Sequence, residues 1–143
     1  MYWDTSAILK LYVRERDSDY FLNLVARAEE QFLTSAIASM ELLCALERKE
    51  RNGDLKSGGA NAAFERFLND TRRGRIVEIP YGRDVLEEAR KLFGYVSDRR
   101  ILIRSLDMIH IASAIAVKAK SVVATDSRLR QVASLASVKL LPD

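Results

Sequence analysis

The sequence predicts an α/β fold, a three-layer sandwich in which a central, mostly parallel sheet of four to five strands is flanked by helices. Short β-branched or aromatic segments alternate with longer segments whose apolar residues recur at helical spacing. One or two helices separate successive strands, which requires parallel pairing with right-handed crossovers. The 143 residues contain no repeat and no linker, so we expect a single domain over residues 1–143.

The first quarter of the chain predicts two strands and two helices. Residues 1–4 are short and aromatic, as in a strand, and apolar residues recur at helical spacing through 7–14. A second helix follows over 18–30, because Ser18 is a suitable cap and the apolar residues behind it share one face. Residues 31–34 predict the next strand.

The middle of the chain predicts two helices and a third strand. Ser35 has the chemistry of a cap, and the apolar pattern behind it continues until Gly53, where a helix should stop. We expect Asp54 to cap a further helix over 55–73. The alternation of apolar and polar residues over 75–79 predicts a strand.

Residues 84–143 predict three helices and two strands. Residues 84–95 and 106–120 are helical by the spacing of their apolar side chains. The β-branched residues of 121–125 predict a strand, after which Asp126 begins another helix. Residues 138–141 predict a strand at the edge of the sheet.

Composition excludes several classes of protein and of site. With 48% hydrophobic and 30% charged residues, the chain is globular. Its longest nearly apolar stretch, 108–117, is about half of a membrane span, and the amino terminus lacks the pattern of a cleaved signal. We therefore expect a cytoplasmic protein with no membrane partner. Cys44 and His110 are alone of their types, which excludes cysteine-rich zinc sites and histidine-rich metal centres.

Four acidic residues are candidates for a shared functional site. Asp4 ends the first predicted strand, Asp126 follows a later one, and Asp107 lies in the first turn of a helix. The carboxyl ends of parallel strands and the helix amino termini beside them line one crevice, so these residues are expected to converge. Glu41 lies about two turns into its helix among apolar neighbours, and is either on a polar stripe or buried for a reason.

Clustered carboxylates imply a cation. They stay ionised at close range only if a positive charge neutralises them, and hard divalent ions such as Mg²⁺ prefer oxygen ligands. Such a site favours displacement at phosphorus by an activated water, as in a phosphodiesterase or phosphatase. Each acid also has a purely structural interpretation. Asp4 and Asp126 are suitable helix caps, and Asp107 is favoured by the helix dipole.

The four acids occur in short segments whose order and intervals resemble a known family. These segments are DTSAILKLY at 4–12, SMEL at 39–42, LDMIHIA at 106–112 and ATD at 124–126. Together they resemble the acidic motifs of PIN-domain ribonucleases, and especially the VapC-type toxins of bacterial and archaeal toxin–antitoxin pairs. The resemblance covers essentially the whole chain.

This resemblance implies a PIN-like nuclease domain that cleaves RNA with Mg²⁺ or Mn²⁺. Asp4 and Asp107 would be the principal metal ligands, while Glu41 and Asp126 would complete the site and help to bind or activate water. It also implies two protein partners, a small antitoxin that covers the acidic cleft and a second copy of the chain in a homodimer.

Other polar residues near the motifs have two interpretations each. The hydroxyls of Thr5, Ser6 and Thr125 are candidates to support the metal ligands, or they serve only in caps and turns. His110 lies one turn after Asp107, close enough in sequence to contact the site, and is interpreted as a buried structural histidine.

Three basic clusters are candidate contacts for RNA phosphates, and solvated surface charge is the alternative for each. They are Arg72-Arg73-Gly74-Arg75, Arg99-Arg100 with Arg104, and Arg48, Lys49 and Arg51. The net charge of +3, in spite of the acidic motifs, means that basic residues dominate elsewhere.

Two other functions remain open on the residues alone. A non-catalytic PIN-like module that only binds RNA or protein would have the same fold. A Mg²⁺-dependent small-molecule phosphatase on a similar sheet usually carries two aspartates at alternate positions. Ser6 occupies the second of these positions, which counts against the phosphatase.

Overall fold

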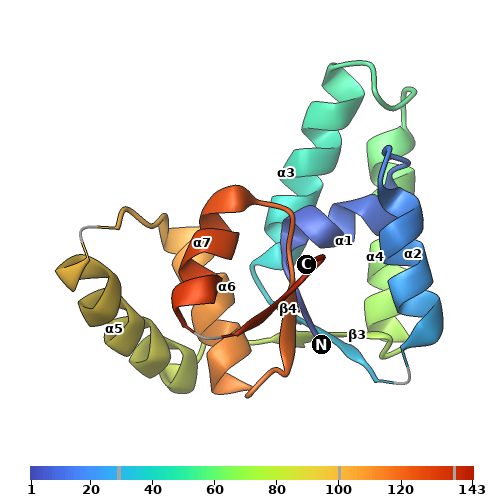
Figure 1. Cartoon of the computed structure of the whole chain (residues 1–143). Helices are drawn as coiled ribbons and strands as arrows, with labels where there is room; N and C mark the ends of the chain where they lie inside the picture. The colour runs from blue at the N-terminus through green and yellow to red at the C-terminus, as the bar shows by residue number, and fades with distance from the viewer. Residues whose placement is uncertain (29, 100, 137) are drawn as a thin grey trace.

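The computed structural model describes residues 1–28, 30–99, 101–136 and 138–143, which form one five-stranded sheet between two layers of helices (Figure 1). All of the strand pairs are parallel, and the strand order is β3-β2-β1-β4-β5. The strands are β1 (Tyr2–Trp3), β2 (Phe32–Ser35), β3 (Ile76–Ile79), β4 (Ser121–Val123) and β5 (Lys139–Leu141). The predicted three-layer α/β fold is confirmed.

The helices divide into two groups, one on each face of the sheet. The first group consists of α1 (Thr5–Tyr12), α2 (Ser18–Arg27), α3 (Ala38–Arg51) and α4 (Gly59–Arg72). The second consists of α5 (Arg83–Asp98), α6 (Ser105–Ala116) and α7 (Ser127–Leu135). Each group buries its apolar stripe against a separate hydrophobic core, so the sheet is covered on both sides.

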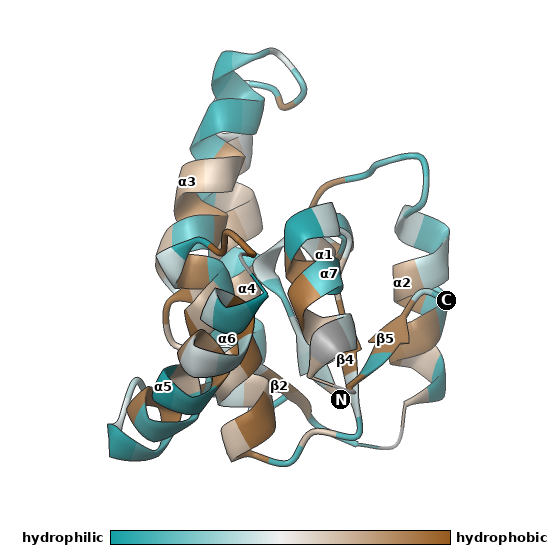
Figure 2. Ribbon diagram, turned by 60° about the vertical axis from the view of Figure 1, so that its left-hand side comes forward, coloured by the Kyte–Doolittle hydropathy of each residue, from teal (hydrophilic) through white to brown (hydrophobic). Residues whose placement is uncertain are grey.

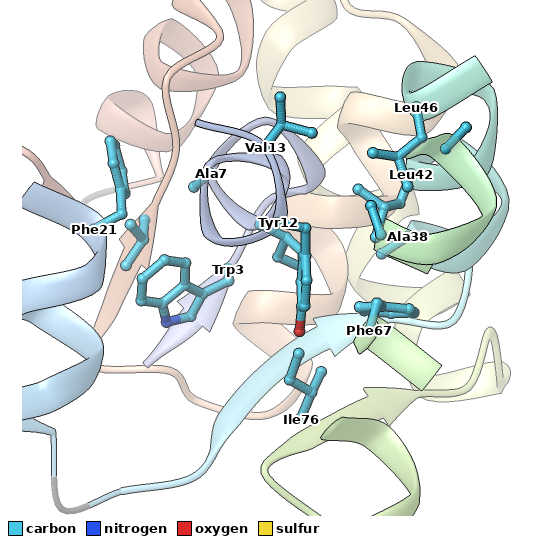
Figure 3. Packing of buried hydrophobic residues seen from close by; sticks show 14 residues of the cluster. Trp3, Ala7, Tyr12, Val13, Phe21, Ala38, Leu42, Leu46, Phe67 and Ile76 are labelled. Carbon is cyan, nitrogen blue, oxygen red and sulfur yellow. The ribbon is translucent and has the colours of Figure 1, made fainter. Parts of the chain in front are cut away.

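The two residues of β1 show how one short strand serves both cores. Successive side chains of a strand point to opposite faces, so Trp3 enters the core under the first group of helices and Tyr2 enters the other. Figure 3 shows the first core, where Trp3 lies near Phe21; their ring centroids are 6.3 Å apart. Because β1 is the central strand, Tyr2 and Trp3 are almost fully buried.

The helix predicted over 55–73 begins later than the sequence indicated, and Asp54 does not cap it. The first residue of α4 is Gly59, and its amino terminus is capped by Glu50 at the end of α3. The Glu50 carboxylate accepts hydrogen bonds from the backbone N–H groups of Gly58 and Ala60 at 2.9 and 2.7 Å. This contact closes the α3–α4 hairpin, which extends beyond the sheet and is hydrophilic at its far end (Figure 2).

The remaining boundaries follow the sequence within a few residues. The helix predicted to reach residue 120 ends at Ala116, because Lys118 adopts a positive φ of 51° and turns the chain into β4. Arg100, assigned above to a basic cluster, lies outside the described residues. Across the described ranges, no helix is both long and apolar enough to cross a membrane.

Candidate active site

The four predicted acids lie at the carboxyl edge of the sheet. Asp4 directly follows β1 and Asp126 follows the end of β4, next to β1 in the sheet. Glu41 lies in the first turn of α3, which follows β2, and not about two turns into the helix as predicted, because α3 begins at Ala38. Asp107 lies in the first turn of α6, as predicted. All four therefore project from elements that begin or end at the same edge.

Asp4 is buried and serves as the amino-terminal cap of α1. The residue is 5% exposed, and its Oδ2 accepts a hydrogen bond from the backbone N–H of Ser6 at 3.0 Å and another from the Ser6 hydroxyl. Burial raises the pKa of Asp4, and the charge of Glu41 adds to this effect, while His110 and Ser6 oppose it. The capping role is confirmed, and it uses only one of the two carboxylate oxygens.

Glu41 is half-buried, and hydrogen bonds stabilise its negative charge there. Its side chain is 24% exposed, and Oε2 accepts a hydrogen bond from the Thr5 hydroxyl at 2.6 Å and faces Nε2 of His110 at 2.7 Å. Burial alone would raise the pKa of Glu41, but the hydrogen bonds from His110 and Thr5 outweigh it and lower the pKa. The sequence left two interpretations for Glu41, a place on a polar stripe or specific burial, and these contacts support specific burial.

Asp107 has the least satisfied carboxylate of the four. Its Oδ2 is buried and has no hydrogen-bond partner among the described residues. Burial raises the pKa of Asp107, and the negative charges of Asp126, Asp4 and Glu41 raise it further, while Arg104 opposes them. A buried carboxylate oxygen without a donor is costly unless a cation or a proton satisfies it.

Asp126 is the amino-terminal cap of α7, as the sequence indicated. Its Oδ1 accepts hydrogen bonds from the backbone N–H groups of Arg128 at 2.9 Å and Leu129 at 3.1 Å. As in Asp4, the capping bonds go to one oxygen of the carboxylate. A structural role and a role in the site are thus compatible in both residues.

The four carboxylates lie close enough to affect one another electrostatically, but their side chains are not arranged as a complete set of metal ligands. Within residues 1–28, 30–99, 101–136 and 138–143, no three side chains of His, Cys, Asp or Glu are arranged to hold a metal ion as they stand. The chemistry of the set nevertheless fits a hard divalent cation, since all four groups offer carboxylate oxygens. The unpartnered Oδ2 of Asp107 supports this fit, since burial and the charges of the other acids both raise the pKa of that carboxyl.

Three residues that the sequence left ambiguous connect the acids. The Ser6 hydroxyl donates to Asp4 and accepts the backbone N–H of Thr125 at 3.0 Å, so it joins the ends of β1 and β4. Thr5 donates to Glu41. For Thr125, the described bond is made by the backbone N–H group rather than by the hydroxyl.

The sequence allowed a contact between His110 and the site, and also a buried structural histidine, but it did not show that His110 lies between Glu41 and Tyr2. His110 is 1% exposed, and its Nε2 lies 2.7 Å from Oε2 of Glu41 and 3.6 Å from Oδ1 of Asp4. Its Nδ1 lies 2.7 Å from the hydroxyl of Tyr2. The position of His110 about one helical turn after Asp107 was the signal for a contact with the site, whereas for Tyr2 the sequence showed only an aromatic strand.

The basic clusters lie at different edges of the sheet. Arg72, Arg73 and Arg75 end α4 and precede β3, which places them at the amino edge, opposite the acids. Arg75 also pairs with Asp70 at 3.2 Å. Arg104 precedes α6 and is one of the basic residues at the carboxyl edge, where Arg128 in the first turn of α7 is another.

Comparisons with known proteins agree with this architecture. The family model described as the PIN domain matches residues 1–135. No sequence among the curated proteins matches the chain. VapBC2 from Rickettsia felis, solved bound to a DNA fragment from its promoter, shares the fold with a TM-score of 0.71 at 16% identity over 97% of this chain and 95% of that chain. FitAcB from Neisseria gonorrhoeae gives a TM-score of 0.72 at 20% identity over 97% and 94%.

Proposed function

Because the chain belongs to the PIN-domain family, we propose that it is a metal-dependent endoribonuclease and the toxin of a toxin–antitoxin pair. PIN domains are generally nucleases that hydrolyse nucleic acid. The observation that carries the proposal for this chain is the buried, unpartnered Oδ2 of Asp107, which lies in the field of three further carboxylates. A divalent cation would neutralise the charges of all four groups at once.

Asp4 and Asp107 are the residues that we assign as principal ligands of Mg²⁺ or Mn²⁺, with Glu41 and Asp126 completing the site. When bound, such an ion supplies Lewis-acid chemistry, which polarises the phosphate and promotes attack by water. The hydrogen bonds to Glu41 keep it ionised, so it can accept a proton from an attacking water. The capping bonds of Asp4 and Asp126 hold these two side chains in fixed positions.

The assignment as a toxin rests on the structural neighbours. VapBC2 and FitAcB are antitoxin–toxin complexes, and their fold spans nearly the whole of this chain. An antitoxin that places a basic side chain among the four carboxylates would satisfy the same charges as the metal and block the site. We place the reaction in the cytoplasm, where RNA is accessible, and expect the protein to act as a homodimer.

Cleavage of single-stranded RNA by the purified protein tests the enzymatic proposal. We expect cleavage with Mg²⁺ or Mn²⁺, none in excess EDTA, and recovery when metal is restored. Asp4→Asn and Asp107→Asn should both abolish cleavage. Asp19→Asn is the matched control, because Asp19 is an exposed carboxylate that pairs with Arg14 away from the site.

Three outcomes would redirect the proposal. Undiminished cleavage in EDTA would reject the metal mechanism. Tight RNA binding without cleavage in any divalent metal, by a folded protein, would favour the non-catalytic PIN-like module. Hydrolysis of small phosphomonoesters but not of RNA would favour the small-molecule phosphatase.

A further inference from the structure

A buried chain of hydrogen bonds connects the site to Tyr2, whose side chain lies in the core under α5, α6 and α7. It starts at the Tyr2 hydroxyl, passes through the imidazole of His110, and ends on Oε2 of Glu41, with contacts of 2.7 Å at each step. Tyr2 and His110 are 0% and 1% exposed, so water does not compete for these bonds. The two rings meet edge to face, with centroids 5.9 Å apart.

Chemistry determines the direction of each bond. The Glu41 carboxylate can only accept, so the proton between the two residues belongs to Nε2 of His110. With the imidazole proton on Nε2, Nδ1 is an acceptor, and the Tyr2 hydroxyl at 2.7 Å is the donor that faces it. A proton on Nε2 and an acceptor at Nδ1 together describe one tautomer of neutral imidazole.

We propose that Tyr2 and His110 are positioning residues: the hydrogen bonds of His110 to Glu41 and to Tyr2 together hold the imidazole in its Nε2–H tautomer and in one orientation, and His110 thereby fixes the orientation of Glu41 toward the metal. The hydrogen bonds that the structure gives the Glu41 side chain, from Thr5 and His110, both go to Oε2. This arrangement leaves Oε1 as the oxygen for the site. The Nε2–H group also lies 3.6 Å from Oδ1 of Asp4, so it separates two carboxylates that would otherwise repel each other.

The elements that carry the chain of bonds are held in place by their neighbours, as such a role requires. Tyr2 lies in the central strand, paired with Leu33 on one side and Val122 on the other. His110 lies within α6, which packs on β2 and α5. The inference deepens the proposed function, because a role toward metal depends on the site being a metal site, but the tautomer is a property of the metal-free protein.

Nitrogen-15 NMR of the metal-free protein tests the tautomer directly. His110 is the single histidine of the chain, so selective labelling of histidine reports on this ring alone. We expect Nε2 to be protonated and Nδ1 to be unprotonated. Tyr2→Phe should keep the proton on Nε2, because Glu41 still accepts it, but should shift the Nδ1 signal, because the hydrogen bond from the phenol is lost. Tyr12→Phe is the matched control, because it also removes a buried phenol that donates a hydrogen bond, here to Asp70 at 2.9 Å, and should leave the signals unchanged.

Mn²⁺ binding to variants of His110 tests the positioning role. His110→Gln retains an N–H donor that can reach Glu41 and should bind Mn²⁺ with close to wild-type affinity. His110→Met fills the space without a donor and should lose about 10–100-fold in affinity, as is usual when a ligand loses the group that orients it. If His110→Met does not fold, Tyr2→Phe replaces it, with a smaller loss expected in the same direction.

The results separate this inference from the proposed nuclease activity. A proton on Nδ1 in the wild type would overturn the tautomer, and an Nδ1 signal that Tyr2→Phe leaves unchanged would overturn the role of Tyr2. Equal Mn²⁺ affinity for folded Gln and Met variants would overturn the positioning role. Absence of RNA cleavage alongside the expected tautomer and affinities would reject the nuclease and leave the assignment of Tyr2 and His110 standing.

Discussion

Ser6 and Asp126, 120 residues apart in the chain, are joined by a hydrogen bond of 3.3 Å from the Asp126 backbone N–H to the Ser6 hydroxyl. The same hydroxyl accepts the N–H of Thr125 and donates to Asp4. One side chain therefore holds the carboxyl ends of β1 and β4 in register, together with the two acids that follow them.

Ser6→Ala should destabilise the protein, because it leaves the N–H groups of Thr125 and Asp126 without their acceptor. We expect the free energy of unfolding, measured by urea denaturation, to fall by about 1–3 kcal/mol. Ser134→Ala is the control, since Ser134 also makes a hydroxyl hydrogen bond, to the carbonyl of Gln131, but is exposed. Equal losses in the two variants would mean that the Ser6 bonds contribute no more than a bond at the surface.

Asp107→Asn should stabilise the metal-free protein at neutral pH. Folding raises the pKa of Asp107, so ionisation costs the folded state, and wild-type stability falls as the pH rises from about 3.9, the ordinary value for Asp, through the raised pKa. The variant should therefore be the more stable protein at pH 7 and equal to the wild type near pH 3. The comparison is made by thermal unfolding across this range, and a variant no more stable than the wild type at pH 7 would contradict it.

Mg²⁺ and Mn²⁺ should raise the melting temperature of the wild type and leave that of Asp107→Asn nearly unchanged. A ligand that binds only the folded state stabilises it by about 2.7 kcal/mol at a concentration 100 times its dissociation constant. The ranking of the two proteins should therefore reverse between metal-free and metal-saturated conditions. Asp19→Asn should respond to metal as the wild type does, because its carboxylate lies outside the site.

Binding of the RNA backbone should involve the carboxyl edge of the sheet. Replacing both Arg104 and Arg128 by Ala should weaken RNA binding and reduce the slope of log affinity against log salt by about 0.7 for each phosphate that these side chains neutralise. The triple replacement of Arg72, Arg73 and Arg75 should change neither quantity, because these residues lie at the amino edge. Fluorescence anisotropy at several salt concentrations measures both, and the opposite result would place RNA at the amino edge.

Induced expression in a host without the antitoxin should arrest growth. Asp4→Asn, produced at the same soluble level, should be harmless, because it removes a proposed metal ligand while Asn can still cap α1. Co-expression of a small protein encoded beside this gene should restore growth to cells that produce the wild type. If the wild type is harmless, or if Asp4→Asn is equally toxic, the toxin proposal is wrong and the non-catalytic binding module is favoured.

Much of the fold was predictable because its signals are local. A period of about two residues in 75–79 and of 3.6 in 84–95 identified β3 and α5, and Asp126 was recognised as the residue that begins α7. The cap of α4 was not predictable in this way. Glu50 reaches it from the preceding helix across a turn whose shape depends on how α3 and α4 pack, so the nearer Asp54 was the wrong choice.

The sequence by itself predicted the fold class and the edge of the sheet at which the four acids lie. Local periodicity identified the strands and helices, and the helices between successive strands require parallel pairing, which brings the carboxyl ends of the strands to one edge. Only the tertiary structure decided which oxygen of each acid is already occupied, that His110 joins Glu41 to Tyr2, and that Arg72, Arg73 and Arg75 lie away from the site. These features depend on distances between segments that are far apart in the chain. Tertiary packing determines those distances, and they cannot be predicted from local sequence patterns.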